Sequence, residues 1–261
     1  MPEQIDPFKL PFTEAIQYFK AKLPLPSTAW DTFADAATDF AFVLSKVTSA
    51  ELLNDVYNLV LSGLENGDSY GEFKKGFDQA IGKAGWNPAN RPWRTNLIFI
   101  QNLSSAYQAG RYKQQTDPEM LRLRPYWQWS HSNSRVPRLH HLALDSKVFP
   151  ADDPFWKTSY PPSGFLCRCR VFALSQRDIE REGLAVETPP QETVGIQDKA
   201  TGERKRVPAI NGQPIAEPGF TTAPGGSDAQ NREQILQRGL DRLPLKLREQ
   251  AIQAIESRRD R

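Results

Sequence analysis

The stretch Pro161-Pro162-Ser163-Gly164-Phe165-Leu166-Cys167-Arg168-Cys169-Arg170 holds both cysteines of this 261-residue chain. The residues before Pro162 are predicted to be rich in loops, and the residues from Cys169 to Leu174 predict a short strand. In an extended segment, a spacing of two residues places both thiols on the same side. A disulfide between Cys167 and Cys169 would be strained. We therefore expect free thiols, or half of a metal site, in a reducing compartment.

Upstream of this stretch, Tyr126-Trp127-Gln128-Trp129-Ser130-His131 is rich in aromatic residues and predicts a second strand. Alternation places Trp127 and Trp129 on one face of it. Packing in a core is the default interpretation of such a pair, and stacking on nucleic-acid bases is the alternative. The segment between the two strands, from Pro137 to Pro162, is predicted to be rich in loops.

The first 114 residues predict helices, because apolar residues recur there at helical spacing. The expected helices run from Phe12 to Leu23, from a cap at Ser27-Thr28 to Ala41, from Ser49 to Asn66, from Ser69 onward, and from Asn90 to about Lys113. Ser69 and Glu72 have the spacing of a capping box.

The resulting fold class is α+β, with four parts. Residues 1–114 form a helical N-terminal region, and 115–180 form a small mixed α/β core that contains the Cys-x-Cys motif. Residues 181–227 are rich in proline and glycine and are expected to be an extended linker or arm, while 228–261 predict a C-terminal helical pair. We expect no membrane span, since no run of eighteen apolar residues occurs, and no secretion signal, since the N-terminus lacks a basic and an apolar region.

Charge is distributed unevenly along the chain, although the net charge is only +2. Residues 1–90 carry 7 basic and 12 acidic residues, residues 91–177 carry 13 basic and 5 acidic, and the remainder is nearly balanced. The middle third, at +8, is where a polyanion or an acidic partner surface would dock. Its candidate contacts are Arg135, Arg138, Arg168 and Arg170, for which ion pairs to Asp145, Asp152 and Asp153 are the alternative interpretation.

All three histidines lie within eleven residues, upstream of the cysteines. Zinc prefers four sulfur or nitrogen ligands in a tetrahedral shell. Cys167 and Cys169 with His140 and His141 are the candidate ligands, and His131 and Asp145 are further donors. The spacing matches no standard zinc module, so buried structural thiols or a hydrogen-bonded cluster are the default and a zinc site is the alternative.

The order of segments resembles one family, the phage Mu F-like minor head proteins and the related head-morphogenesis proteins. The matching elements lie between residues 95 and 172, in the family's order. They are Gln101 to Tyr112 on a helix, Tyr126-Trp127-Gln128-Trp129, His141 to Lys147, Asp152-Asp153-Pro154-Phe155-Trp156, and Pro161 to Arg170. Ser146 departs from the pattern, because such proteins tend to have glycine after the aspartate of a tight turn.

The resemblance implies a component of a bacteriophage or prophage head rather than an enzyme. It implies action in procapsid assembly near the portal, with portal, capsid or scaffold proteins as partners and contact with packaged double-stranded DNA. The implied location is the virion head, at the capsid interior or the portal vertex, and the host cytoplasm during assembly. The residues that carry the resemblance as a structural motif are Asn102, Tyr107, Arg111, Trp127, Trp129, Asp145 and Trp156. Tyr107 and Arg111 are four residues apart on the predicted helix, and we expect them to pack it onto the small sheet, with Arg111 paired to a loop carboxylate.

An enzyme is the alternative class. His141, Asp145 and a cysteine have the residue types of a small metal-dependent or Cys/His hydrolase, such as a nuclease. However, the chain has no Walker loop, Rossmann glycine pattern, Gly-x-Ser-x-Gly or His-Glu-x-x-His motif. It also lacks the second acidic pair that two-metal catalysis needs.

Overall fold

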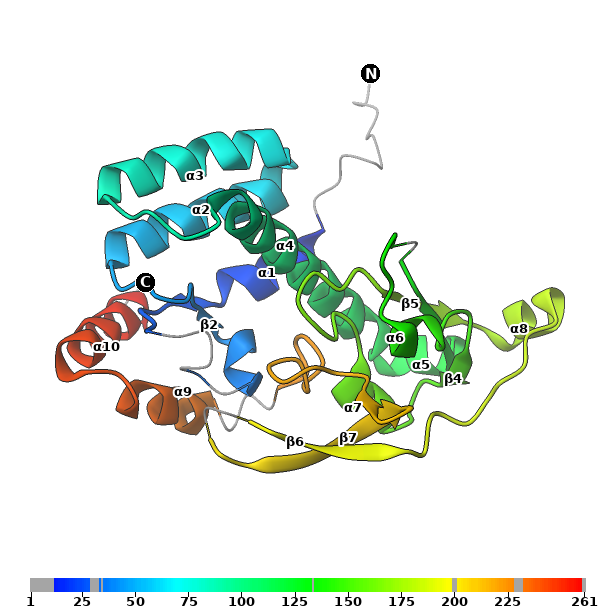
Figure 1. Ribbon diagram of the computed structural model, residues 1–261. Helices are drawn as coiled ribbons and strands as arrows, with labels where there is room; N and C mark the ends of the chain where they lie inside the picture. The colour runs from blue at the N-terminus through cyan, green and yellow to red at the C-terminus, as the bar shows by residue number, and fades with distance from the viewer. Residues whose placement is uncertain are drawn as a thin grey trace, which may run out of the picture.

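The computed structural model describes residues 12–28, 33, 35–132, 134–198, 201–227 and 232–259. Helices and three small sheets make up this part of the chain, which confirms the α+β class. Two compact regions share one long helix, α4, which runs from the helical region into the second core (Figure 1).

The helical region consists of α1 (Thr13–Lys20), α2 (Ala50–Asn66), α3 (Tyr70–Ala84) and the first half of α4 (Arg91–Gln115). Ser49 caps α2 by accepting a hydrogen bond from the Leu52 N–H, and Ser69 and Glu72 form the predicted capping box of α3. The buried side chains of these helices form one hydrophobic core, which includes Phe19, Leu53, Val60, Phe73, Phe77 and Phe99.

The helix expected between Ser27 and Ala41 is wrong over the part that the structure describes. A short 3-10 helix, η1 (Asp35–Asp39), is followed by strand β2 (Ala41–Phe42), which pairs in parallel with β1 (Leu23–Pro24). Tertiary pairing overrides the helical spacing here, because Leu23 and Leu25 donate their N–H groups to the Phe40 and Phe42 carbonyls. Residues 29–32 and 34 of the expected helix lie outside the described residues.

The predicted C-terminal helical pair is present as α9 (Arg232–Asp241) and α10 (Leu245–Arg259), with Pro244 between the two. Leu236, Leu240 and Ala251 of this pair share a hydrophobic core with Leu25 and Ala37. The end of the chain therefore packs against its beginning, as the adjacent blue and red segments of Figure 1 show.

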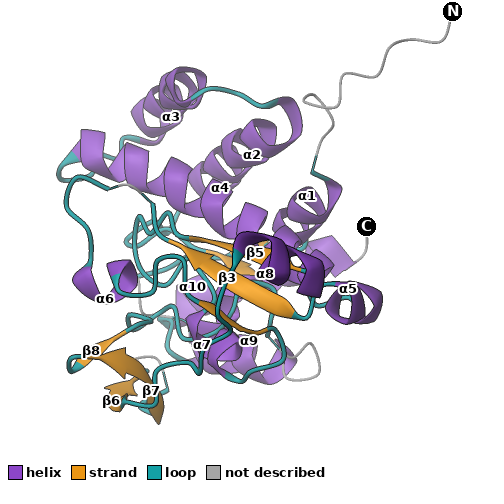
Figure 2. Ribbon diagram, turned by 90° about the vertical axis from the view of Figure 1, so that its right-hand side faces the viewer, coloured by secondary structure: helices purple, strands orange, loops and turns teal. Residues whose placement is uncertain are grey.

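The second core is built on a three-stranded antiparallel sheet, in the order β4 (Val148–Pro150), β3 (Tyr126–Ser130) and β5 (Arg170–Leu174). Figure 2 shows this sheet beside α4 and α8. Around it lie the short helices α5 (Pro118–Leu123), α6 (Leu139–Leu142), α7 (Phe155–Ser159) and α8 (Gln176–Glu182).

The sheet's buried face explains the aromatic strand. Along β3 buried and half-buried residues alternate, which turns Trp127 and Trp129 toward the core, where they are 1% and 0% exposed. Trp129 pairs with Val171 across the sheet, and Trp156 packs within 6.4 Å of its ring. Both β3 tryptophans are therefore core residues and present no ring to a base.

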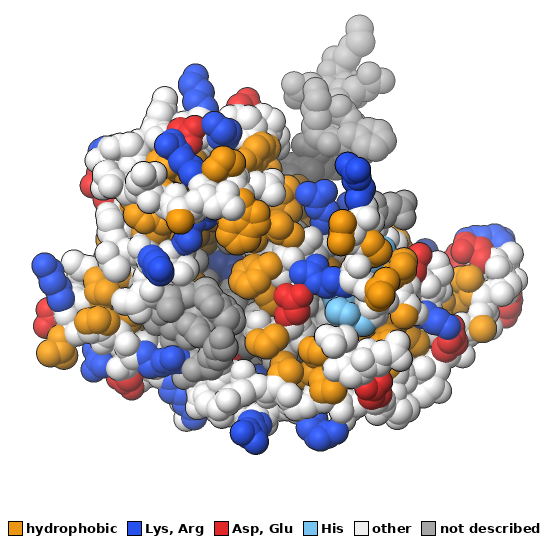
Figure 3. All heavy atoms as spheres, viewed as in Figure 1, with side chains coloured by type: hydrophobic (Ala, Val, Ile, Leu, Met, Phe, Trp, Pro, Cys, Tyr) orange, Lys and Arg blue, Asp and Glu red, His pale blue; other side chains and the backbone are white. Residues whose placement is uncertain are grey.

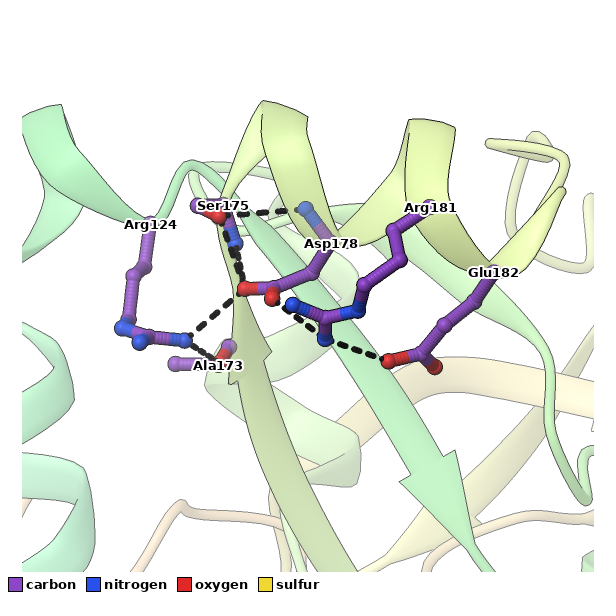
Figure 4. A network of polar contacts seen from close by, with 6 residues as sticks. All are labelled: Arg124, Ala173, Ser175, Asp178, Arg181 and Glu182. Carbon is purple, nitrogen blue, oxygen red and sulfur yellow. Dashed lines mark hydrogen bonds and ion pairs between the residues drawn. The ribbon is translucent and has the colours of Figure 1, made fainter.

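Helix α8 is fixed to the end of this sheet by a polar network centred on Asp178 (Figure 4). The Asp178 carboxylate accepts hydrogen bonds from the Ser175 N–H and hydroxyl, and pairs with Arg124 and Arg181 at 3.1 and 2.8 Å. These contacts, the Ser175 backbone N–H foremost, lower the pKa of Asp178 to about 2.

The expected extended arm is instead partly a sheet. Strands β6 (Thr193–Gln197), β7 (Arg204–Ile210) and β8 (Gln213–Pro214) form an antiparallel meander along one side of the molecule. Beyond it, Ile215 and Ala223 are buried in the second core. The proline- and glycine-rich composition did not predict the sheet or these buried residues, because the segment contributes only a few apolar residues to a core that other segments build.

Candidate functional site

The turn before β5 sets the position of the cysteines. The Cys167 N–H donates to the Gly164 carbonyl, and Leu166 takes a left-handed conformation with φ of 58°. The chain is extended from there, so buried and exposed side chains alternate. Cys167 and Cys169 point into the core, each 3% exposed, while Arg168 and Arg170 point to solvent.

Helix α4 holds the backbone of this segment through three glutamines at a spacing of seven residues. Gln101 Oε1 accepts from the Leu166 N–H at 2.8 Å, and Gln108 Nε2 donates to the Cys169 carbonyl at 2.8 Å. Gln115 Nε2 donates to the Val171 carbonyl at 3.1 Å. A seven-residue spacing keeps side chains on one face of a helix, so the three amides follow the strand.

These glutamines were not predicted from the sequence, although their seven-residue spacing was a readable signal. The residues predicted on the same helix were Asn102, Tyr107 and Arg111. Asn102 Nδ2 donates to the Ile98 carbonyl within α4, and the Tyr107 ring stacks 5.7 Å from Phe12 in the helical region rather than on the small sheet. Among the described residues Arg111 has no ion pair, so the expected pairing with a loop carboxylate is not formed.

His141 on α6 meets the two thiols in the interior. Its Nδ1 lies 3.7 Å from Cys167 Sγ and 3.7 Å from Cys169 Sγ, and the residue is 1% exposed. His141 Nε2 lies 2.8 Å from the Ile215 carbonyl, which accepts only. Nε2 therefore donates its N–H to this carbonyl, and Nδ1 faces the two sulfurs. We call these three side chains the thiol–imidazole cluster.

The two thiols perturb each other. The pKa of Cys167 is lowered well below its usual value, chiefly by the hydrogen bond from Cys169 and then by His141. The same hydrogen bond, followed by burial, raises the pKa of Cys169. The Trp129 indole N–H makes no hydrogen bond of ordinary geometry but lies close enough to lower the pKa of Cys169 slightly. The two thiols therefore titrate as a pair and not independently.

The other candidate donors lie outside this cluster. The His140 ring is 4.6 Å from that of His141, and its buried Nε2 has no hydrogen-bond partner. Burial lowers the pKa of His140, with the neighbouring His141 and Arg138 adding to the effect. Asp145 Oδ1 accepts from the His131 backbone N–H at 2.7 Å. Of the donors expected from the sequence, the structure thus brings together His141, Cys167 and Cys169 within 4.8 Å.

This arrangement does not assemble the Cys/His/Asp constellation of the alternative hydrolase interpretation. The His141 ring is oriented by the Ile215 carbonyl and not by the Asp145 carboxylate, which is engaged with His131. Cys167 and His141 are also sealed from solvent, at 3% and 1% exposure. A nucleophile and its base need access to a substrate.

Among the described residues, the arginines do not form the ion pairs with Asp145, Asp152 and Asp153 that were the alternative interpretation. Asp145 binds the His131 N–H and Asp153 Oδ1 accepts from the Phe155 N–H at 2.8 Å. Arg138 instead pairs with Glu217 at 2.7 Å and donates to the Phe165 carbonyl. Within the described part of the chain, Arg135, Arg168 and Arg170 have no carboxylate partner and are exposed. We call these three the free arginines.

A cavity of about 430 Å³ lies between the helical region and the loop near Phe220. Its walls include Trp93, Leu97, Ile98, Phe165 and Phe220, and apolar surface dominates. The thiol–imidazole cluster does not line this cavity.

Hydrophobic and basic side chains gather over the central part of the molecular face in Figure 3. No helix within the described residues is both long and apolar enough to cross a bilayer.

Comparison with known proteins shows to which proteins this chain is similar. The profile of the family described as phage Mu protein F like protein matches residues 54–172, from α2 through the cluster into β5. The Mu-like prophage FluMu F protein of Haemophilus influenzae is 34% identical over 194 residues, which cover 68% of this chain and 46% of that protein.

A second relative is named as capsid assembly protein F of Escherichia phage Mu and is 30% identical to this chain. The match covers 97% of this chain and 63% of that relative. The chain therefore spans about half to two thirds of the relatives it matches. No solved structure matches.

Proposed function

Since this chain belongs to the phage Mu F-like family, we propose that it is a minor head protein of a phage or prophage and acts in head assembly by binding other head components. The observation that carries this proposal is the alignment of 97% of the chain with a relative named for capsid assembly. The buried cluster supports binding over catalysis, since it offers no accessible reactive group.

Complementation tests this role. In the phage or prophage that encodes the chain, its gene is interrupted and the lysate is examined by electron microscopy. We expect absent or defective heads, and normal heads when the chain is supplied from a plasmid. Normal heads and full infectivity without the chain would contradict the proposal.

We further propose that the chain acts at the portal vertex or the capsid interior and contacts packaged DNA through the free arginines. Residues 91–177 carry the +8 charge, and Arg135, Arg168 and Arg170 are not neutralised by a carboxylate among the described residues. Guanidinium groups bind phosphate through two parallel hydrogen bonds, and such binding weakens as salt rises.

A gel shift with double-stranded DNA at several salt concentrations tests the DNA contact. Replacing the free arginines by glutamine should reduce the magnitude of the log–log salt slope by up to about 2.7, or about 0.9 per phosphate contact. Lys74→Gln with Lys83→Gln, in the acidic N-terminal region, is the matched control and should leave the slope unchanged. An equal slope for both variants would rule out the free arginines as the contact.

Portal binding is tested separately, by mixing purified chain with the portal protein of the same phage. Co-migration in size-exclusion chromatography is the expected result. Separate elution at low salt, with both proteins folded, would exclude the portal as the partner and leave the capsid interior.

A further inference from the structure

The three donor atoms of the thiol–imidazole cluster have the separations of ligands around a common ion. With zinc–sulfur bonds of about 2.3 Å and zinc–nitrogen bonds of about 2.0 Å, tetrahedral angles place sulfur and nitrogen about 3.6 Å apart. The two observed separations, from His141 Nδ1 to each Sγ, are both 3.7 Å. The three donor atoms lie within 4.8 Å of one another.

The orientation of His141 also fits a ligand. A metal-binding histidine usually donates its second N–H to a carbonyl or carboxylate, which fixes the ring and leaves the other nitrogen for the metal. His141 Nε2 makes this bond to the Ile215 carbonyl at 2.8 Å. Ile215 is 0% exposed, so this anchor is rigid.

The surroundings hold the sulfurs in place without help from a metal. Gln108 fixes the Cys169 carbonyl, and the Trp129 ring packs against His141 at 5.7 Å. The Trp129 indole N–H is buried and has no hydrogen-bond partner, so a thiolate at Cys169 would supply an acceptor nearby. Paired thiolates in a buried site are stabilised only by a compensating cation.

We propose that Cys167, Cys169 and His141 bind one zinc ion that stabilises the second core. Two sulfurs and an imidazole nitrogen are ligands that favour zinc over the hard cations, which prefer oxygen. As each sulfur–zinc bond forms, the thiol releases its proton to solvent, so no oxidant or reductant is needed. The zinc thus ties the turn before β5 to α6.

Elemental analysis of the full chain, purified without a metal-affinity tag, is the first test. We expect about one zinc per chain. Cys167→Ser, Cys169→Ser and His141→Gln should each lose it, while His131→Gln, outside the cluster, should retain it. Zinc that persists in all three cluster variants would overturn the proposal.

A second measurement covers variants that fail to fold. The chain has only two cysteines, so a thiol reagent counts both without ambiguity. We expect no rapid reaction of native protein, two reactive thiols after a strong chelator, and renewed protection when zinc is added back. Cobalt added to the chelator-treated chain should produce a thiolate-to-metal absorption band. Metal-free wild-type protein that neither binds cobalt nor changes thiol reactivity with chelator would refute zinc binding.

Discussion

Replacing Gln115 by leucine should weaken the connection between α4 and the second core by removing a hydrogen bond at each end of one buried amide. Gln115 Nε2 donates to the Val171 carbonyl and its Oε1 accepts from the Tyr160 hydroxyl at 2.9 Å. Gln115 is 8% exposed and Tyr160 is 0% exposed, so water cannot replace these bonds.

The magnitude follows from the two groups left unpaired. Each buried polar group without a partner costs about 1–3 kcal/mol, and the leucine returns about 1–2 kcal/mol by burying more apolar surface. Two such groups cost about 2–6 kcal/mol together, so we expect a net loss of about 2.5 kcal/mol in the free energy of unfolding, the middle of the resulting range. Urea denaturation followed by tryptophan fluorescence measures it, as a midpoint shift on the order of 1 M.

The adjacent Gln114 provides a matched control. It lies on the same helix but is exposed, and it bonds to the Glu14 side chain at 3.0 Å. Gln114→Leu should cost no more than about 0.5 kcal/mol. If Gln115→Leu costs as little as Gln114→Leu, the reasoning is wrong.

A double-mutant cycle isolates the tyrosine end of the bond. Tyr160→Phe removes the hydroxyl that donates a hydrogen bond to Gln115 Oε1. Once the hydroxyl is gone, Gln115→Leu should cost less, with a coupling of about 0.5–3 kcal/mol. Additive losses would show that the hydroxyl contributes nothing through Gln115.

Substitutions at three further positions test the zinc site, the turn at Ser146 and the polar network at Asp178. His140 lies outside the thiol–imidazole cluster, so His140→Ala should leave zinc affinity unchanged, as measured by competition with a chelator; a loss of about tenfold or more would show that His140 supports the zinc shell. Ser146 has a φ of 63°, so Ser146→Gly should stabilise the chain by about 0.5–1 kcal/mol and Ser146→Val should destabilise it. Thermal unfolding measures both changes. A valine variant more stable than the glycine variant would show that the backbone of this turn is unstrained. Asp178→Ala should lower the midpoint of unfolding at neutral pH. The difference in midpoint from wild type should narrow as pH falls from about 4 toward 2, because the pKa of Asp178 is held at about 2, below its usual 3.8. A difference in midpoint that does not change with pH would contradict this prediction.

Local signals in the sequence predicted much of the helical region and the two main strands. Ser49, and the Ser69–Glu72 pair, are caps whose effect depends on neighbours three residues away, so the helix starts were readable. The alternation of Trp127 and Trp129 predicted their shared face in the same way. The turn at Ser146 was also anticipated, and its left-handed backbone explains why glycine is favoured there.

Long-range pairing accounts for what the sequence did not reveal. The apolar spacing from Phe33 to Ala41 is compatible with a helix, yet Leu23 and Leu25 draw the chain into a small parallel sheet. The β6–β7 pairing was hidden for a similar reason, because its strands are mostly exposed and carry little apolar signal.

The site was predicted in its residue types but not in its geometry. Both thiols and His141 were selected, but their meeting depends on a turn at Leu166 and a carbonyl from Ile215, more than 40 residues later. The partners of the arginines were also set by the tertiary fold, since the Arg138 partner, Glu217, comes from a segment expected to be an extended arm.

The composition of purified heads tests the central claim most directly. Heads from the phage or prophage that encodes the chain are separated from soluble protein by gradient sedimentation and analysed by quantitative mass spectrometry. If the chain is a minor head protein, its peptides sediment with the heads at far fewer copies than the major capsid protein. Recovery of the chain only in the soluble fraction, at every stage of assembly, would contradict the account.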